Sequence, residues 1–200
     1  KPRFDMSGAA YAEDDDKNVD IDMLGFIAVP YDNGQYSVHM NYARAWNLVG
    51  FTNSQLGAYQ TAMSTASTPS QIMDAYYSNL SFNDVGDMDF ATILFKTEGI
   101  GNGISDYLDN TIAFASFAAS KTNPNDKGML GSQDSETGTS VWLGVNAPCP
   151  ILPDSAKIGF EWNKGSKYWR SMTYGEDTYA GSKIATRGQA WEVYRTQKLT

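Results

Sequence analysis

The chain has 200 residues, of which 42% are hydrophobic, with one cysteine, one histidine and a formal charge of −8. Its mean hydropathy is −0.42, and no apolar run reaches the roughly 18 residues of a membrane-spanning helix. A bundle of such helices is therefore excluded, although a membrane protein built of alternating strands is not. The single cysteine, Cys149, excludes a disulfide framework within the chain. Residues 1–100 hold 13 acidic and 5 basic side chains, so nucleic acid is not expected as a partner.

Strand patterns recur along the chain and predict an all-β fold of antiparallel hairpins. Asp32-Asn33-Gly34 is a hairpin signal between two of these strands, because Asn-Gly supplies the positive φ angles of a type I′ turn. The predicted strands are residues 3–12, 19–29, 35–48, 87–98, 111–120, 139–146, 156–163, 167–174 and 188–199.

The segment 35–48 has the clearest alternation. Successive side chains of a strand point to opposite faces, so one face here is aromatic and aliphatic and the other is polar. A soluble strand usually has about 5–6 residues, whereas a tilted strand that crosses a bilayer needs about 9–11. Tyr36 and Trp46, near its two ends, fit the aromatic girdles of a membrane barrel. A long strand of a soluble sandwich is the alternative.

Three regions between the strands are predicted to be long loops with short helical turns: 52–86, 99–110 and 121–138. Within the first, Ser70 is predicted to cap a short helix over 71–80, directly after Pro69. Long loops that alternate with strands are typical of a barrel and also of a sandwich.

Asp14, Asp16 and Asn18 stand at alternate positions, as the first oxygen ligands of a calcium loop do. Val19 in place of glycine and Gly25 in place of glutamate exclude an EF-hand. A looser cation site stays open for this acidic turn, and a solvated loop is the alternative. No cofactor is expected.

No catalytic constellation is predicted. His39 has Ser37 and Asn41 beside it on the same face, but neighbours two positions apart on one strand do not form a triad. A glycosidase needs two carboxyl groups about 5–10 Å apart across a cleft. Glu161 and Glu192 lie on predicted strands, but nothing in the sequence selects them as a pair. We therefore expect no enzymatic activity.

Residues 163–178 combine Lys, Arg, Trp and Tyr with an acidic end. In a pore, opposed basic and acidic side chains would create a transverse field at a narrow point. The alternative is a hairpin with surface ion pairs, which contribute little stability. The residues expected to line a pore are Gln35, Ser37, His39, Asn41, Lys157, Glu161, Asn163, Lys167, Arg170, Glu176 and Asp177.

The segment 165–178, GSKYWRSMTYGEDT, resembles a family of uncharacterised bacterial outer-membrane proteins that are porin-like. The segment 101–110, GNGISDYLDN, and Met129-Leu130-Gly131-Ser132 are similar to further segments of that family. The resemblance implies a β-barrel in the bacterial outer membrane. Members are longer than this chain, so it implies that the chain is a portion of a barrel. The family has no established catalytic residues, and none is transferred.

We therefore expect all or part of a transmembrane outer-membrane β-barrel for passive passage of small solutes or ions. Its partners would be outer-membrane lipid and these solutes, and a homo-oligomer stays open. One alternative is a soluble exported β-sandwich that binds glycans or a protein through its Tyr and Trp residues. Another is a barrel that acts as a scaffold around a second envelope protein.

Overall fold

A computed structural model describes residues 21–171 and 183–198 of the chain. This part is mostly antiparallel β-sheet with few helices, so the all-β prediction is confirmed at that level. The predicted strand 3–12 lies outside the described residues.

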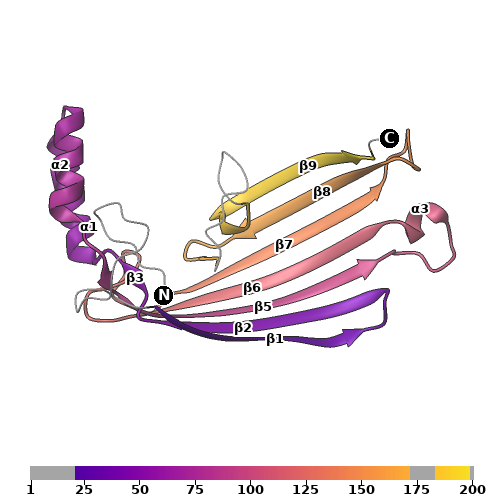
Figure 1. Cartoon of the computed structure of the whole chain (residues 1–200), viewed down its shortest axis with the longest axis horizontal. Helices are drawn as coiled ribbons and strands as arrows, with labels where there is room; N and C mark the ends of the chain where they lie inside the picture. The colour runs from indigo at the N-terminus through magenta and orange to yellow at the C-terminus, as the bar shows by residue number, and fades with distance from the viewer. Residues whose placement is uncertain (1–20, 172–182, 199–200) are drawn as a thin grey trace. The chain divides into compact units, whose positions relative to one another are not determined.

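Seven strands form one sheet in the order β1-β2-β5-β6-β7-β8-β9 (Figure 1). A separate short pair is formed by β3 (Val49–Gly50) and β4 (Asn83–Asp84). Within the described residues, β1 and β9 end the order and no closed barrel is formed. The seven strands are β1 Asp22–Asp32, β2 Tyr36–Trp46, β5 Gly86–Glu98, β6 Ile112–Pro124, β7 Thr137–Pro148, β8 Ala156–Gly165 and β9 Gly188–Gln197.

Seven of the predicted strands correspond to these seven within a few residues at each end. The predicted strand 167–174 is wrong over its described part, because residues 166–171 form a turn and coil. The amide of Trp169 donates to the carbonyl of Ser166 at 3.1 Å, which closes the chain into a turn directly after β8.

The hairpin between β1 and β2 is present, but it is not the type I′ turn that we predicted. Of the two turn residues only Gly34 has a positive φ, +84°. The side chain of Asn33 instead accepts hydrogen bonds from the amides of Gln35 (3.0 Å) and Tyr36 (2.7 Å). This side chain replaces a backbone acceptor in the turn, so Asn33 does not need the left-handed conformation.

Residues 52–86, predicted as a loop with one short helix, contain two helices, α1 (Asn53–Thr65) and α2 (Pro69–Asn79). Each begins with a capping box, Thr52 with Gln55 and Thr68 with Gln71. The cap of α2 is therefore Thr68 and not Ser70, since proline fits the first helical position. A further helical turn, α3 (Asp106–Asp109), lies in the predicted loop 99–110, and η1 (Lys183–Ala185) precedes β9.

The chain divides into two compact units, each containing several separate segments. Unit 1 consists of Lys1–Leu24, Arg44–Asp89 and Lys121–Glu136. Unit 2 consists of Gly25–Ala43, Phe90–Ser120 and Thr137–Thr200.

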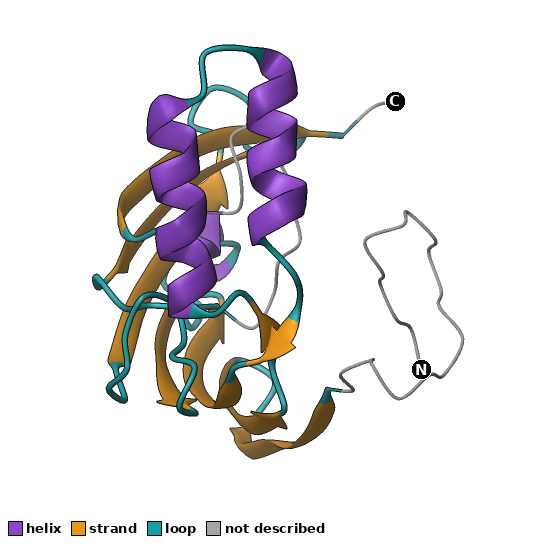
Figure 2. Ribbon diagram, turned by 90° about the vertical axis from the view of Figure 1, so that its left-hand side faces the viewer, coloured by secondary structure: helices purple, strands orange, loops and turns teal. Residues whose placement is uncertain are grey.

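Unit 1 contains the two helices, which lie side by side (Figure 2). The rings of Tyr59 and Tyr76 meet edge to face between them, with centroids 6.4 Å apart. The buried side chains of this unit are mainly apolar: Ala45, Thr52, Ala75, Leu80, Val85, Met88, Thr122 and Met129. Unit 1 therefore has an ordinary hydrophobic core.

Unit 2 contains β7, β8 and β9, which pair in a continuous antiparallel register. Val145 lies opposite Phe160, and Phe160 lies opposite Val193. This register decides which side chains share a face, and it positions the site described next.

Candidate functional site

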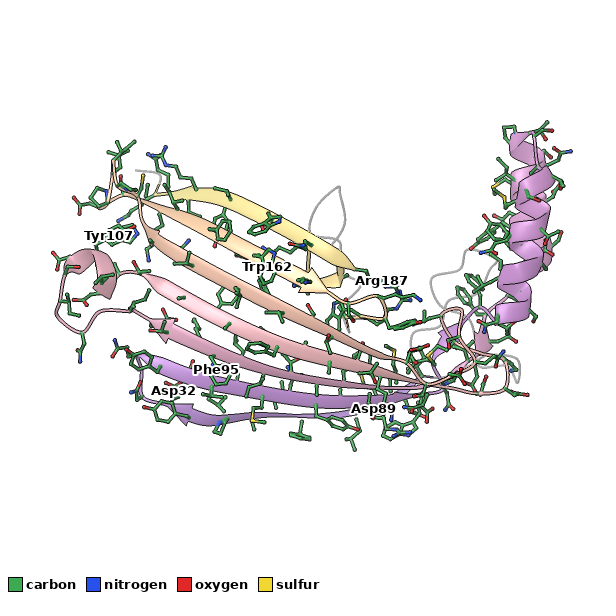
Figure 3. All side chains as sticks on the ribbon, turned by 180° about the vertical axis from the view of Figure 1, so that it is seen from behind. Asp32, Asp89, Phe95, Tyr107, Trp162 and Arg187 are labelled. Atoms are coloured by element: carbon green, nitrogen blue, oxygen red, sulfur yellow. The ribbon has the colours of Figure 1, made fainter. Side chains whose placement is uncertain are left out.

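One face of β7, β8 and β9 is apolar and exposed. Leu143 of β7, Trp162 of β8 and Trp191 of β9 are aligned across the three strands, and Figure 3 labels Trp162 on β8. The Phe160 ring lies 5.6 Å from the ring of Trp191. We call this the apolar face; its residues here are Val141, Leu143, Val145, Ala147, Ile158, Phe160, Trp162, Trp191 and Val193.

The opposite face of the same strands is polar, and several of its residues on β7 and β8 are buried. Glu161 is only 8% exposed and Asn163 only 2%, whereas Phe160 on the apolar face is 39% exposed. Asn163 donates to the hydroxyl of Ser140 at 3.3 Å. Aromatic side chains contribute too, because Phe114 and Trp142 meet edge to face at 4.7 Å. We call this the polar face.

The same division continues onto β6. Phe114 contacts Trp142 on the polar face, so the side chains of Ser116 and Ser120 also lie there and that of Phe117 lies on the apolar face. The exposure agrees with this division, since both serines are buried and Phe117 is 47% exposed.

Exposed apolar side chains are also present on the remaining strands of unit 2. Phe26 of β1 and Tyr42 of β2 lie on the same side of their hairpin, with ring centroids 5.8 Å apart. Met40 of β2 and Phe95 of β5, labelled in Figure 3, are exposed as well. Large hydrophobic side chains are therefore exposed on β1, β2, β5, β6, β7, β8 and β9.

A charged cluster lies on the polar face of β8 and β9. Glu161 and Glu192 are directly opposite each other in the β8–β9 register. Lys183 of η1 binds both carboxylates, with 2.7 Å between its Nζ and Glu161 Oε2. Trp142 Nε1 donates to the same oxygen of Glu161 at 2.9 Å, and the Lys183 ammonium lies over the Trp142 ring, 5.6 Å from its centroid.

These contacts change the protonation of Lys183. Partial burial alone would lower the pKa of its ammonium, but hydrogen bonds and charge interactions with Glu161 and Glu192 outweigh that cost. The net result is a raised pKa. Lys183 therefore stays charged at neutral pH and neutralises one of the two facing carboxylates.

Comparison with known proteins adds one finding. The family described as "Protein of unknown function (DUF3373)" matches residues 1–200. The chain belongs to the DUF3373 family. No curated protein and no solved structure matches it. The expected resemblance to an uncharacterised family is confirmed, while the outer-membrane and porin-like part of that expectation stays a prediction.

The structure of this DUF3373 chain places the predicted pore-lining residues in three groups. Gln35, in the turn before β2, donates to the carbonyls of Gly99 and Gly101 at 3.0 and 2.8 Å. On β2, His39 and Ser37 are hydrogen-bonded at 3.0 Å, and Asn41 is exposed. No acid completes a triad with His39 in these contacts.

The second group lies on β8, and the third follows it. Lys157 shares the polar face with Glu161 and Asn163, and its Nζ donates to the carbonyl of Asn110 at 3.3 Å. Lys167 and Arg170 lie in the coil after β8; Lys167 donates to the hydroxyl of Tyr168 at 3.0 Å. Glu176 and Asp177 lie outside the described residues, as do the cation-site candidates Asp14, Asp16 and Asn18.

Two members of the charged cluster were not among the predicted site residues. Lys183 and Glu192 are 22 or more residues from Glu161 in sequence, and only the β8–β9 pairing brings them to it. Glu161 and Glu192 do face each other, as a carboxylate pair would, but Lys183 occupies the place between them. Among the described residues, no group of three or more potential metal ligands is present, and no helix has the length and apolar character to cross a membrane.

Proposed function

We propose that this chain forms part of a β-barrel of the bacterial outer membrane that allows small solutes or ions to pass. In this arrangement the apolar face contacts lipid and the polar face lines the interior. The observation that carries the proposal is the inverted burial on β8. Phe160 and Ile158 are exposed, whereas Glu161 and Asn163 are buried.

Elementary energetics support this reading. Exposed apolar side chains are common singly, but a contiguous apolar surface across several strands marks a binding or membrane surface. A buried carboxylate is retained only where it is paired, and Glu161 is paired with Lys183. In lipid, the apolar face is in its preferred solvent, and the polar groups gather on the side away from it.

The length and borders of the strands fit a bilayer. β2 spans 11 residues, which agrees with the roughly 9–11 residues of a tilted membrane strand. Beyond Tyr42 the same face continues with Arg44, which pairs with Asp87 at 2.9 Å, and then with Trp46 at the end of the strand. Trp162 and Trp191 of the apolar face, with ring centroids 5.9 Å apart, suit a girdle at one interface.

The two end strands place a condition on the proposal. Backbone donors and acceptors must all be paired within lipid, so β1 and β9, which end the sheet of the described residues, must be joined to further strands. A barrel completed by other parts of the protein or by further copies of the chain would meet this condition.

Adjacent residues of β6 provide a direct test. On a Cys149→Ser background, Ser116→Cys and Phe117→Cys are each labelled with a small fluorophore after refolding into lipid vesicles. Nitroxide groups on the acyl chains should quench the label at Phe117, while the label at Ser116 should be quenched by aqueous iodide or not at all. Equal quenching of both sites by the lipid nitroxide would contradict the assignment of the faces.

Passage of solutes is tested separately. Vesicles that contain the protein should release a small entrapped ion and retain a large dextran. A protein that needs no detergent or lipid to stay in solution would favour the sandwich alternative. Insertion with the expected quenching but no release would favour the scaffold alternative.

A further inference from the structure

We infer that the β8–β9 connection forms a fixed constriction on the polar face, and that Glu161, Lys183 and Glu192 there set the charge preference of the passage. The connection is defined by its described residues, 166–171 and 183–187. This inference rests on the proposed function, since a constriction requires a passage.

The first part of the connection lies directly on the sheet. Ser166 continues the pairing with β7, because its amide donates to the Thr139 carbonyl and its hydroxyl accepts from the Thr139 amide, each at 2.9 Å. A Cβ at Gly138, on the polar face of β7, would lie 2.3 Å from the Cα of Trp169. Only glycine therefore allows the backbone of the connection to lie so close to the polar face.

Gly165 of β8 likewise allows close approach of the connection. A Cβ at Gly165 would lie 2.1 Å from the carbonyl oxygen of Thr186 and 2.8 Å from the Trp169 ring. Both described ends of the connection thus pack against the polar face of the sheet, one over Gly138 and the other over Gly165.

The two ends also hold each other. Trp169 is buried, and its Nε1 donates to the carbonyl of Ile184 at 2.8 Å, while Arg187 Nε donates to the Trp169 carbonyl at 3.1 Å. The amide of Arg170 donates to the hydroxyl of Ser120 on β6 at 3.1 Å. Because hydrogen bonds from the connection reach β6 and β7, and both of its described ends pack against Gly138 and Gly165, these residues are anchored to the polar face as a fixed element.

The charged cluster lies where this element meets the sheet. Like charges directly opposite each other across two strands are unfavourable, so Glu161 and Glu192 would repel without Lys183. Glu161 is largely buried, so its field is screened less by salt than that of an exposed charge. Lys167, Arg170 and Arg187 also belong to the connection.

The side chain of Asn163 independently indicates that a polar molecule or ion lies against the polar face. Asn163 is buried, and its Oδ1 has no hydrogen-bond partner among the described residues. A buried acceptor left unpaired is costly, so a donor beyond the described residues is expected to reach it. Water or a hydrated cation in the passage would provide this donor. Asn163 is two positions along β8 from Glu161, so the donor would lie close to the charged cluster.

Reversal potentials in a planar bilayer under a KCl gradient test the inference. One unit charge about 4 Å away in water corresponds to about a fivefold effect on ion occupancy. We therefore expect Glu192→Gln to lower the ratio of potassium to chloride permeability about fivefold, and Lys183→Gln to raise it by a similar factor. Asp154→Asn, an equal charge change in the exposed turn between β7 and β8, should leave the ratio unchanged.

Chemical restoration of the charge provides a test that is independent of how each variant folds. In a Cys149→Ser, Lys183→Cys protein that already conducts, an aminoethyl thiosulfonate reagent adds a positive charge to the thiol as a mixed disulfide and releases a sulfinate. The permeability ratio should return towards that of the parent. A neutral reagent of similar size should not restore it.

The outcomes separate the two proposals. A parent protein that carries no current overturns both the proposed function and this inference. A parent that conducts, with variants at Glu192 and Lys183 whose reversal potentials equal its own, overturns the inference alone.

Discussion

The two compact units of this chain distribute their side chains in opposite ways. In unit 1, Met88, Val85 and Leu80 are buried and form a conventional core. In unit 2, Glu161 and Asn163 are buried, while the apolar side chains of the same strand are exposed. The buried side chains of unit 1 are therefore mainly apolar, whereas on β8 of unit 2 Glu161 and Asn163 are buried and Ile158 and Phe160 are exposed.

This difference shows why average composition is uninformative here. A single chain with ordinary hydrophobic content can place its apolar residues inside in one region and outside in another. On β8 and β9 the exposed apolar residues follow alternate positions (Ile158 and Phe160, Trp191 and Val193), so they are a property of one face and not scattered exceptions.

The largest effect is expected in the core of unit 1. Met88→Ala should lower the free energy of unfolding by about 2–5 kcal/mol, because the side chain is 2% exposed and its removal leaves a cavity. Urea unfolding of the refolded protein measures this change. Ile72→Ala, on the exposed surface of α2, is the matched control and should change little. Equal losses at both positions would contradict the assigned core.

The next largest effect is expected from placing an arginine at an exposed apolar residue of unit 2, compared with one of unit 1. Phe117→Arg on β6 should cost about 2–4 kcal/mol in vesicles, the range for an arginine facing the middle of a bilayer. Met73→Arg on α2 should stay within about 0.5 kcal/mol, since that side chain is exposed to water. The two side chains are exposed to a similar degree, 47% and 50%. A neutral Phe117→Arg would remove the contrast between the units.

A smaller effect is expected at the start of α2. Thr68→Ala removes the side chain that accepts from the Gln71 amide, and it should destabilise the helix by about 0.5–2 kcal/mol. Amide hydrogen exchange in residues 69–79 measures the local loss. Thr65→Ala, at the end of α1, provides a threonine control without a cap, and faster exchange of α2 in that variant would argue against the capping box.

The smallest effect concerns pH. Lys183 has a raised pKa in the folded protein, so its ion pairs contribute fully below its ordinary value of 10.5 and are lost as the pH rises through the folded value. The contribution of this group to the free energy of unfolding should therefore stay constant between neutral pH and the folded pKa. Urea titration measures the difference in unfolding free energy between the parent and Lys183→Gln. This difference should shrink only above the folded pKa of Lys183. A difference that shrinks at neutral pH would contradict this linkage.

Much of the architecture could be predicted from local patterns. The alternation in 35–48 and 156–163 predicted β2 and β8, because side chains repeat with a period of two residues in a β-strand and not in a helix. The capping boxes at Thr52 and Thr68 are also visible in the sequence, as a threonine followed three residues later by a glutamine. We nevertheless predicted no helix at 53–65. The type I′ turn was wrong because the side chain of Asn33 satisfies the turn, a contact that the dipeptide Asn-Gly does not reveal.

The sequence by itself determined which side chains alternate, where most strands lie and that Glu161 and Asn163 share a face, since these follow from the geometry of one strand. Only the tertiary structure decided that this polar face is the buried one and the apolar face the exposed one. It also decided that Lys183 lies between Glu161 and Glu192. The physical reason is that burial and ion pairing depend on strand register and on a connection that folds back over Gly138 and Gly165, and neither is encoded in any single segment.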